Sequence, residues 1–487
     1  MKKLFLFPAI LLFVSCSGSK QSPHQYIPSS GIAQFRSSDT AVVNSYDWAR
    51  DMALSYAHDS LDPVGFWYEA ALPQREAFCM RDVSHQSIGA EVLGLKKHNQ
   101  NMFTKFAENI SESRDWCSYW EINRHNEPAP VDYENDQAFW YNLNANFDVM
   151  FACQRLFNWT GDSMYIKDPA FVNFFDKSVN QYIAKWALEP DQIMTREVFM
   201  NAPQPMDMNN RFHTCRGLPS YVESFYDVTA SADLVSTIYA GLTARSEMAA
   251  LQGNDSEKQL YAQKAQVYRD LLENEWWCDS ANTYYTFRRA GKQELYHEVG
   301  PFLLWFNATE NRDRVAATLA AIGTKDWNIE NRSHFPVIYY KYNQNDEAYK
   351  HLNMLKQLPR AEYPEVSYGV VEGVVTGYMG IQPDASEMKI ATCAKFQNES
   401  DWAEIRDLAL LGGYVNVRHL SKTETELTNN TPHVLIWKAM FQNPQPYCIV
   451  DSRKEAVQYD YDVLGNKLAY IEIQIEPGET KQVLSSL

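Results

Sequence analysis

Apolar residues recur every three to four positions along most of this chain, from Ala41 to about Gly380. Such a period predicts amphipathic helices. Turn-forming residues interrupt the pattern at 62–65, 158–161, 253–255 and 300–301. Pairs of helices, separated by longer polar loops, return roughly every 50–60 residues without a strict sequence repeat. The chain must therefore fold largely as a series of paired helices that share one large core.

After about Glu387, apolar residues recur at every second position, which predicts β-strands. Apolar and polar residues alternate in segment 414–419, and segment 434–441 is densely apolar. Segment 459–475 has the pattern of a hairpin that turns at Gly465-Asn466. We therefore expect a mainly α protein, with a helical domain over 39–385 and a small antiparallel, sandwich-like β domain over 386–487.

The N-terminus has the features of a secretory signal. Lys2 and Lys3 precede a short apolar run, and the run ends in Phe-Val-Ser-Cys at Cys16. This ending resembles a bacterial lipobox, which implies that residues 1–16 direct export and that Cys16 carries the lipid anchor. Cleavage by an ordinary signal peptidase, with loss of Cys16, is the alternative. Residues 17–38 are rich in Ser, Gln, Pro and Gly and predict a flexible tether. We expect an outer-membrane lipoprotein that is periplasmic or exposed at the cell surface.

Charge and composition exclude several partners. The formal net charge of -17 disfavours nucleic acid and anionic membrane surfaces, so the lipid anchor is the expected membrane contact. Seven cysteines follow Cys16 without a Cys-x-x-Cys pair, and no metal-binding or phosphate-binding motif is present. The sequence therefore predicts neither a metal nor a cofactor.

Arg81, Asp82 and His85 form the first candidate site. Their spacing places all three on one face at the start of a predicted helix. A cation, a carboxylate and an imidazole together can bind a polar ligand such as a sugar. The alternative is a surface ion pair with a capping Asp.

The helical pattern and these residues together resemble the six-hairpin, (α/α)6-barrel glycosidases. Met80-Arg81-Asp82 is similar to the Arg-Asp pair that several of these families use to hold a sugar, and segments 116–120 and 139–141 look like aromatic platforms for sugar rings. The resemblance covers roughly 40–380 and implies an (α/α)6 toroid with an appended β domain. It also implies a glycosidase, with a glucuronidase-type member as the first expectation.

Glycoside cleavage needs two carboxyl groups, a proton donor and a base or nucleophile. One candidate pair is Glu134 and Asp136, which precede an amphipathic segment and can equally complement a helix dipole.

A second cluster, in a long loop, contains Arg211, Arg216, Tyr221 and Glu223. Either arginine can bind a substrate carboxylate, as a uronic acid would require, or pair structurally with Glu223 and Asp227.

Glu365 and Glu372 form a third cluster near the end of the helical domain, where related barrels often place the base. Glu365 can also be a simple helix-start acid, and Glu298 is a weaker candidate. We predict Glu223 as the general acid, desolvated by its aromatic neighbours, and Glu365 as the base or nucleophile. Glu134 and Asp136 are the reserve pair.

The expected function is an exo-acting glycoside hydrolase that removes a terminal sugar, and the first expectation for that sugar is a uronic acid. Its partner is an oligosaccharide or polysaccharide. Two alternatives remain: a polysaccharide lyase on a similar toroid, with Tyr221 and His213 in place of Glu223, and a glycan-binding lipoprotein without turnover.

Overall fold

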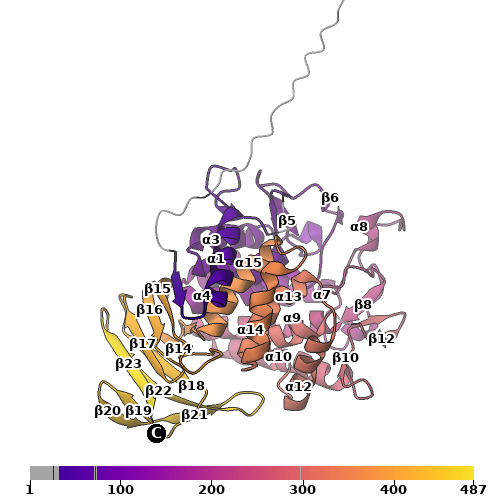
Figure 1. Ribbon diagram of the computed structural model, residues 1–487. Coiled ribbons are helices and arrows are strands. Elements are labelled where there is room, and N and C mark those ends of the chain that lie inside the picture. Colours follow the sequence, from indigo (N-terminus) through magenta and orange to yellow (C-terminus); the bar gives the residue numbers. More distant parts are fainter. Residues whose placement is uncertain (1–25, 27–31, 71, 73, 297, 487) are drawn as a thin grey trace, which may run out of the picture.

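The computed structural model describes residues 26, 32–70, 72, 74–296 and 298–486 (Figure 1). The predicted signal segment, Cys16 and most of the predicted tether lie outside these residues. The end of the tether does not: Gln34–Ser37 form strand β1, which pairs antiparallel with β15 (Ala403–Leu410). Backbone pairing to the C-terminal sheet orders this part of the segment, so the expectation of a flexible tether up to residue 38 is wrong there.

Six helices of the described chain form a closed ring of contacts. In order they are α2 (Met80–Val92), α4 (Ala145–Thr160), α9 (Ala232–Leu251), α11 (Gly300–Trp305), α13 (Ile329–Lys341) and α15 (Pro364–Glu372). Each packs against the next, and α15 packs against α2.

The helices that alternate with them in sequence lie outside this ring. They are α1 (Thr40–Ser55), α3 (Lys96–Glu108), α6 (Pro169–Lys177), α10 (Asp255–Glu275), α12 (Arg312–Thr324) and α14 (Asn345–Met354). Short helices α5 (Met164–Lys167), α7 (Ile183–Lys185) and α8 (Arg211–Thr214) lie in the connections.

Burial explains which helices are inside. Every residue of α2 except Arg81 is buried, whereas α10 buries a single stripe at Tyr261, Ala265, Tyr268 and Leu272. An all-round buried helix must be surrounded by others, and a one-stripe helix can face solvent. None of the described helices is long and apolar enough to cross a membrane.

Two glycines let three inner helices approach closely. A Cβ on Gly89 of α2 would overlap the Tyr368 carbonyl of α15, and one on Gly369 would lie 2.7 Å from the Ser333 carbonyl of α13. The absence of a side chain at these positions lets α15 lie directly against both α2 and α13.

The C-terminal strands form two larger sheets that lie beside the helices (Figure 1). One sheet has the order β13 (Gln382–Asp384), β14 (Lys389–Cys393), β18 (Leu435–Phe441), β22 (Lys467–Ile475) and β21 (Gln458–Tyr461). The other has the order β1, β15, β16 (Gly413–His419), β17 (Glu424–Asn429), β23 (Thr480–Ser486), β19 (Tyr447–Val450) and β20 (Arg453–Ala456).

Alternate residues of β18 are buried, as its sequence pattern predicts, and the predicted hairpin at 459–475 is present as β21 and β22. The expectation of a purely antiparallel arrangement is wrong at one place, because β14 and β18 pair in parallel.

Small sheets line the loops between helices. They pair β2 (Ala57–His58) with β3 (Trp67–Tyr68), β4 (Ala77–Cys79) with β5 (Glu121–Asn123), β6 (Tyr133–Asn135) with β7 (Ala138–Phe139), β9 (Trp277–Cys278) with β10 (Thr283–Tyr284), and β8 (Val228–Ser231) and β12 (Lys292–Glu294) with β11 (Phe287–Arg289). An apolar stripe at helical spacing predicts a helix from Phe139 onward, with Phe139, Leu143, Phe147, Met150 and Phe151 on one face. Phe139 instead lies in one of these hairpins, and the helix itself begins only at Ala145.

Candidate active site

A cavity of about 740 Å³ lies where the inner helices begin. It is lined by the start of α2, by Phe302 near the start of α11, by the first residues of α13 and by Glu365, the second residue of α15. Seven of the predicted catalytic and substrate-binding residues line it: Arg81, Asp82, His85, Arg211, Tyr221, Glu223 and Glu365. Residues from distant parts of the chain therefore meet in one cleft, which we call the cleft below.

Inner helices place a carboxylate in their first turn. These residues are Asp82 in α2, Asp148 in α4, Asp233 in α9, Glu330 in α13 and Glu365 in α15. The unpaired N–H groups and the macrodipole of a helix N-terminus stabilise negative charge there. These acids therefore do complement the helix dipoles, as the alternative interpretation held. The same preference explains why so many acids gather at one end of the ring.

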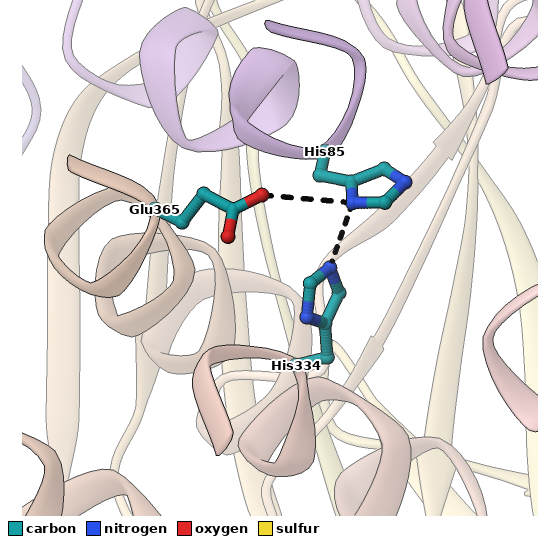
Figure 2. A group of neighbouring side chains, drawn as sticks. All are labelled: His85, His334 and Glu365. Carbon is teal, nitrogen blue, oxygen red and sulfur yellow. Dashed lines mark hydrogen bonds and ion pairs between the residues drawn. The ribbon is translucent and has the colours of Figure 1, made fainter. Parts of the chain in front are cut away.

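Glu365 lies at the buried end of the cleft beside His85, which in turn contacts His334 (Figure 2). His85 Nδ1 lies 3.8 Å from Glu365 Oε1 and 3.1 Å from His334 Nε2, and His85 Nε2 lies 3.6 Å from Asp148 Oδ1. Burial acts to raise the pKa of Glu365, but the neighbouring His85 and the positive charge of Arg81 outweigh it and lower the pKa. Glu365 is therefore held ionised.

The histidines have opposite titration behaviour. Burial acts to lower the pKa of His85, but the carboxylates of Asp148 and Glu365 raise it to about 9. Burial lowers the pKa of His334 to about 3, with a further contribution from the neighbouring His85. Near neutral pH, His85 is thus a cation between two carboxylates, and His334 is neutral.

Asp82 carries a proton near neutral pH. Its side chain is 2 % exposed, and burial together with the charge of Glu365 raises its pKa to about 8, although Arg81 acts in the other direction. Two neighbouring carboxyl groups whose pKa values are pushed apart are the usual basis for separate acid and base roles.

Glu223 lies in the open part of the cleft. Its side chain is 45 % exposed, and Arg81 Nη1 lies 3.1 Å from its Oε1. The expectation that aromatic neighbours bury this carboxylate is wrong, because Phe225 packs instead against Phe287 and Tyr296.

Arg81 connects several parts of the cleft. Its Nε lies 3.4 Å from Asp82 Oδ1, and its guanidinium lies over the rings of Trp120 and Tyr221, at 5.6 and 5.7 Å from their centroids. Tyr221 donates a hydrogen bond of 2.5 Å from its hydroxyl to Asp148 Oδ1.

A second charged group on the cleft wall was missed in the sequence. Arg75 Nη2 lies 2.7 Å from Glu121 Oε2 and 2.9 Å from Asp132 Oδ2, and Arg211 Nη2 lies 2.9 Å from Asp132 Oδ1. Burial raises the pKa of Glu121 to about 8, with Arg75 opposing. Arg75, Glu121, Asp132 and His334 belong to no short motif, so the sequence contained no signal that would have found them.

Four of the predicted site residues do not line the cleft. Asp136 forms an ion pair with Arg114 at 2.8 Å. Burial acts to raise the pKa of Asp136, but hydrogen bonds from Ser113, Tyr133 and Arg114 outweigh burial and lower the pKa to about 2. Glu134 is exposed on β6. Both residues lie beside a hairpin turn and not at the start of a helix, and neither member of the reserve pair lines the cleft.

Arg216 has a buried structural role. Its side chain is 1 % exposed, it pairs with Asp115 at 2.5 Å, and it lies over the rings of Phe139 and Trp186. It does not line the cleft and therefore does not support the expected contact with a substrate carboxylate.

Glu372 is buried at the far end of α15 and pairs with Arg155. It lines a second cavity of about 350 Å³, next to β13 and the end of α4. Burial raises its pKa, with Arg155 opposing.

The predicted aromatic platforms are only partly in place. Trp120 and Trp140 line the cleft, with ring centroids 4.4 Å apart, whereas Trp116, Phe139 and Tyr141 do not line it. Glu298, the weaker candidate acid, also lines the cleft.

Comparison with known proteins supports the fold. No family model and no curated protein sequence matches the chain. Among solved structures, it resembles an α-L-rhamnosidase from Dictyoglumus thermophilum, with a TM-score of 0.62 and 11 % identity over 94 % of this chain and 51 % of that one.

A GH78 family rhamnosidase of Bacillus sp. GL1 gives a TM-score of 0.56 at 10 % identity, over 82 % of this chain and 40 % of that one. A putative kojibiose phosphorylase from the human microbiome gives 0.54 at 8 % identity, over 91 % and 63 %. This chain spans about half the length of the rhamnosidases. At such low identity the likeness shows the fold alone, and it confirms the predicted resemblance to six-hairpin, glycoside hydrolase-like folds.

Proposed function

We propose that this chain is an exo-acting glycoside hydrolase built on an (α/α)6 barrel, with the closed ring of six helices as its inner wall. The observation that carries the proposal is the placement of Glu223 and Glu365 at different depths of one cleft. Glu365 is buried and ionised, and Glu223 is open to solvent. The glycosidase-like fold of the neighbouring structures supports this assignment.

The depth of each carboxyl group in the cleft decides which one is the acid and which is the base or nucleophile. In an exo-acting enzyme the terminal sugar fills the closed end of the pocket, and the leaving group points to the mouth. Glu365, at the closed end, acts as base or nucleophile, and Glu223, at the mouth, donates the proton to the leaving oxygen. His85 is a positioning residue, because its contact with Glu365 keeps that carboxylate charged and oriented.

Arg81 connects substrate binding to proton donation. Its guanidinium pairs with Glu223. A sugar hydroxyl at Arg81 and Asp82 would compete for this guanidinium, and the leaving group would cover Glu223 from water.

The remaining walls suit a sugar. Protonated Asp82 offers a hydroxyl hydrogen to a sugar oxygen, and Trp120 and Trp140 offer apolar faces. Arg211 lines the cleft with its side chain 48 % exposed and is the residue we assign to the carboxylate of a uronic acid. The more specific part of the proposal is that the terminal sugar is a uronic acid, so that the specificity is of the glucuronidase type.

The lyase alternative is less well supported. It needs Tyr221 or His213 as the base. Burial raises the pKa of Tyr221 well above its ordinary value, and its proton is donated to Asp148. His213 accepts a hydrogen bond from the Asp207 amide and does not line the cleft.

The decisive experiment measures released reducing sugar over a panel of plant and host glycans and over aryl glycosides. Release of a terminal sugar by the wild type, and its loss in Glu365→Gln, is the expected result. Glu223→Gln should lose most activity on substrates with poor leaving groups and far less on aryl glycosides with good ones. Glu134→Gln, which changes an exposed acid away from the cleft, is the matched control and should keep full activity.

Asp82→Asn separates the two candidate acids. As a sugar-holding residue, Asp82 should matter equally for good and poor leaving groups. A leaving-group dependence in Asp82→Asn instead of Glu223→Gln would transfer the acid role to Asp82. Absorbance from a new C=C bond in the product would establish the lyase, and glycan binding without turnover would establish the non-catalytic alternative.

We further propose that the protein is an exported lipoprotein anchored through Cys16. The support is the signal-like sequence of residues 1–16 and its lipobox-like ending.

A further inference from the structure

Three side chains at the closed end of the cleft point toward one another. His85 comes from α2, His334 from α13 and Glu365 from α15, and all three are buried (Figure 2). One nitrogen of each histidine and one oxygen of Glu365 all lie within 4.8 Å of one another. Two imidazoles and one carboxylate are a donor set that divalent transition metals prefer.

A polar group behind each ring, hydrogen-bonded to His334 and ion-paired with His85, orients the donors. His334 Nδ1 lies 2.8 Å from the carbonyl oxygen of Glu330. A carbonyl only accepts, so Nδ1 carries the hydrogen and Nε2 presents its lone pair to the cluster. His85 Nε2 faces Asp148 at 3.6 Å, which leaves Nδ1 directed at the cluster. A carboxylate or carbonyl behind each histidine is the arrangement found around metal-binding histidines.

The spacing is close to what a metal needs. Donors bound to Zn²⁺ at about 2.0–2.1 Å in a tetrahedron lie about 3.3 Å apart. His85 Nδ1 and His334 Nε2 are 3.1 Å apart, and His85 Nδ1 and Glu365 Oε1 are 3.8 Å apart. An inward movement of the Glu365 carboxylate would complete the geometry, because the three ligand atoms lie within 4.8 Å of one another.

The cluster is also reachable. All three residues line the cleft, so an ion can enter from solvent and keep a water in a fourth position. The close approach of the three helices at Gly89 and Gly369 holds the donors at this distance.

We propose that His85, His334 and Glu365 bind a divalent transition metal ion such as Zn²⁺. The ion takes the place of the hydrogen that His85 Nδ1 donates, and the proton leaves to solvent. Two of three donors are nitrogen, which disfavours Mg²⁺ and Ca²⁺. One consequence rests on the proposed function: a coordinated Glu365 is no longer a free base, so metal binding inhibits the hydrolase.

Binding is tested without any substrate. The full-length protein, stripped of metal with a chelator, is titrated calorimetrically with Zn²⁺, and with Co²⁺ as a visible probe. We expect one ion per chain, with Co²⁺ bands typical of nitrogen and oxygen ligands. His334→Gln should weaken binding at least about 100-fold, because it removes a ligand outright. His125→Gln, at an exposed histidine outside the cleft, is the matched control and should bind as the wild type does.

The outcomes are separable. Absence of saturable 1:1 binding, equal affinity in His334→Gln, or thiolate bands in the Co²⁺ spectrum would each overturn the proposal. Glu365→Gln gives a second variant in case His334→Gln fails to fold, and it should also weaken binding. Metal binding without glycosidase activity would leave the site standing and refute the proposed function, whereas activity without metal binding would do the reverse. Inhibition by Zn²⁺ in the wild type that is lost in His334→Gln would connect the two.

Discussion

Replacing Gly369 by Ala tests the close packing that assembles the site. The new Cβ would lie 2.7 Å from the Ser333 carbonyl oxygen, whereas ordinary contact begins at 3.4 Å, so the shortfall of 3.4 − 2.7 is 0.7 Å. The obstacle is backbone of α13, which cannot rotate away. Gly373, four residues further on, meets the side chain of Pro336 on the same helix.

The size of the effect follows from two opposing terms. Gly→Ala inside a helix stabilises by about 1 kcal/mol, and overpacking of a tight core costs about 1–3 kcal/mol. Gly323 of α12 offers a matched control, because a Cβ there would meet its nearest neighbour, Tyr339 Oη, at 3.7 Å. We expect Gly323→Ala to be neutral or stabilising and Gly369→Ala to be less stable than it by about 1–3 kcal/mol.

The assay compares urea unfolding of both variants with turnover of the glycoside that the panel identifies. Ser333 is adjacent to His334, and Glu365 lies one turn before Gly369, so separation of α13 and α15 would displace the site. Turnover of Gly369→Ala should therefore fall, by up to about 100-fold for a displacement near 1 Å. If Gly369→Ala is as stable as Gly323→Ala and turns over normally, the helices are not in the tight contact described, and the reasoning fails.

Three further changes have defined outcomes. Arg155→Met leaves the buried Glu372 without its cation, and we expect the unfolding free energy at neutral pH to fall by about 3–5 kcal/mol. This loss should become smaller at acid pH, where Glu372 is protonated. An unchanged unfolding free energy would contradict the pairing. His419 donates a hydrogen bond to the Met379 carbonyl, and burial lowers its pKa from 6.5 to about 4. As the pH falls from about 6.5 to about 4, the unfolded chain therefore binds a proton at this residue before the folded chain does. Stability should fall by about 3 kcal/mol over that window, and His419→Gln should flatten this part of the unfolding profile. Cys16→Ala should release the protein into the soluble fraction after lysis, and a variant that stays with membranes would refute the anchor.

Local patterns were sufficient to predict much of the architecture. Apolar periodicity depends on neighbours within one or two turns, so the helical region, the change to strands and the hairpin at 459–475 could all be predicted. The helix expected from Phe139 begins later because Phe139 pairs with Tyr133 across a hairpin, a contact that periodicity does not register.

The grouping of acids at helix starts is also a local property. Asp82 and Glu365 lie in the first turns of their helices, and residue type and spacing are enough to mark Arg81, Asp82, His85 and Glu365 as candidates. Their chemistry rests on residue type and position in a helix, which the sequence alone determined.

Tertiary structure decided which candidates meet and in what state. Glu223 and Glu365 come together, while Arg216 and Asp136 are held by their own ion pairs elsewhere. His334 joins the site only because α13 packs against α15 through Gly369. The protonation of a carboxyl depends on burial and on charges brought from remote segments, and a contact across several hundred residues leaves no trace in local spacing.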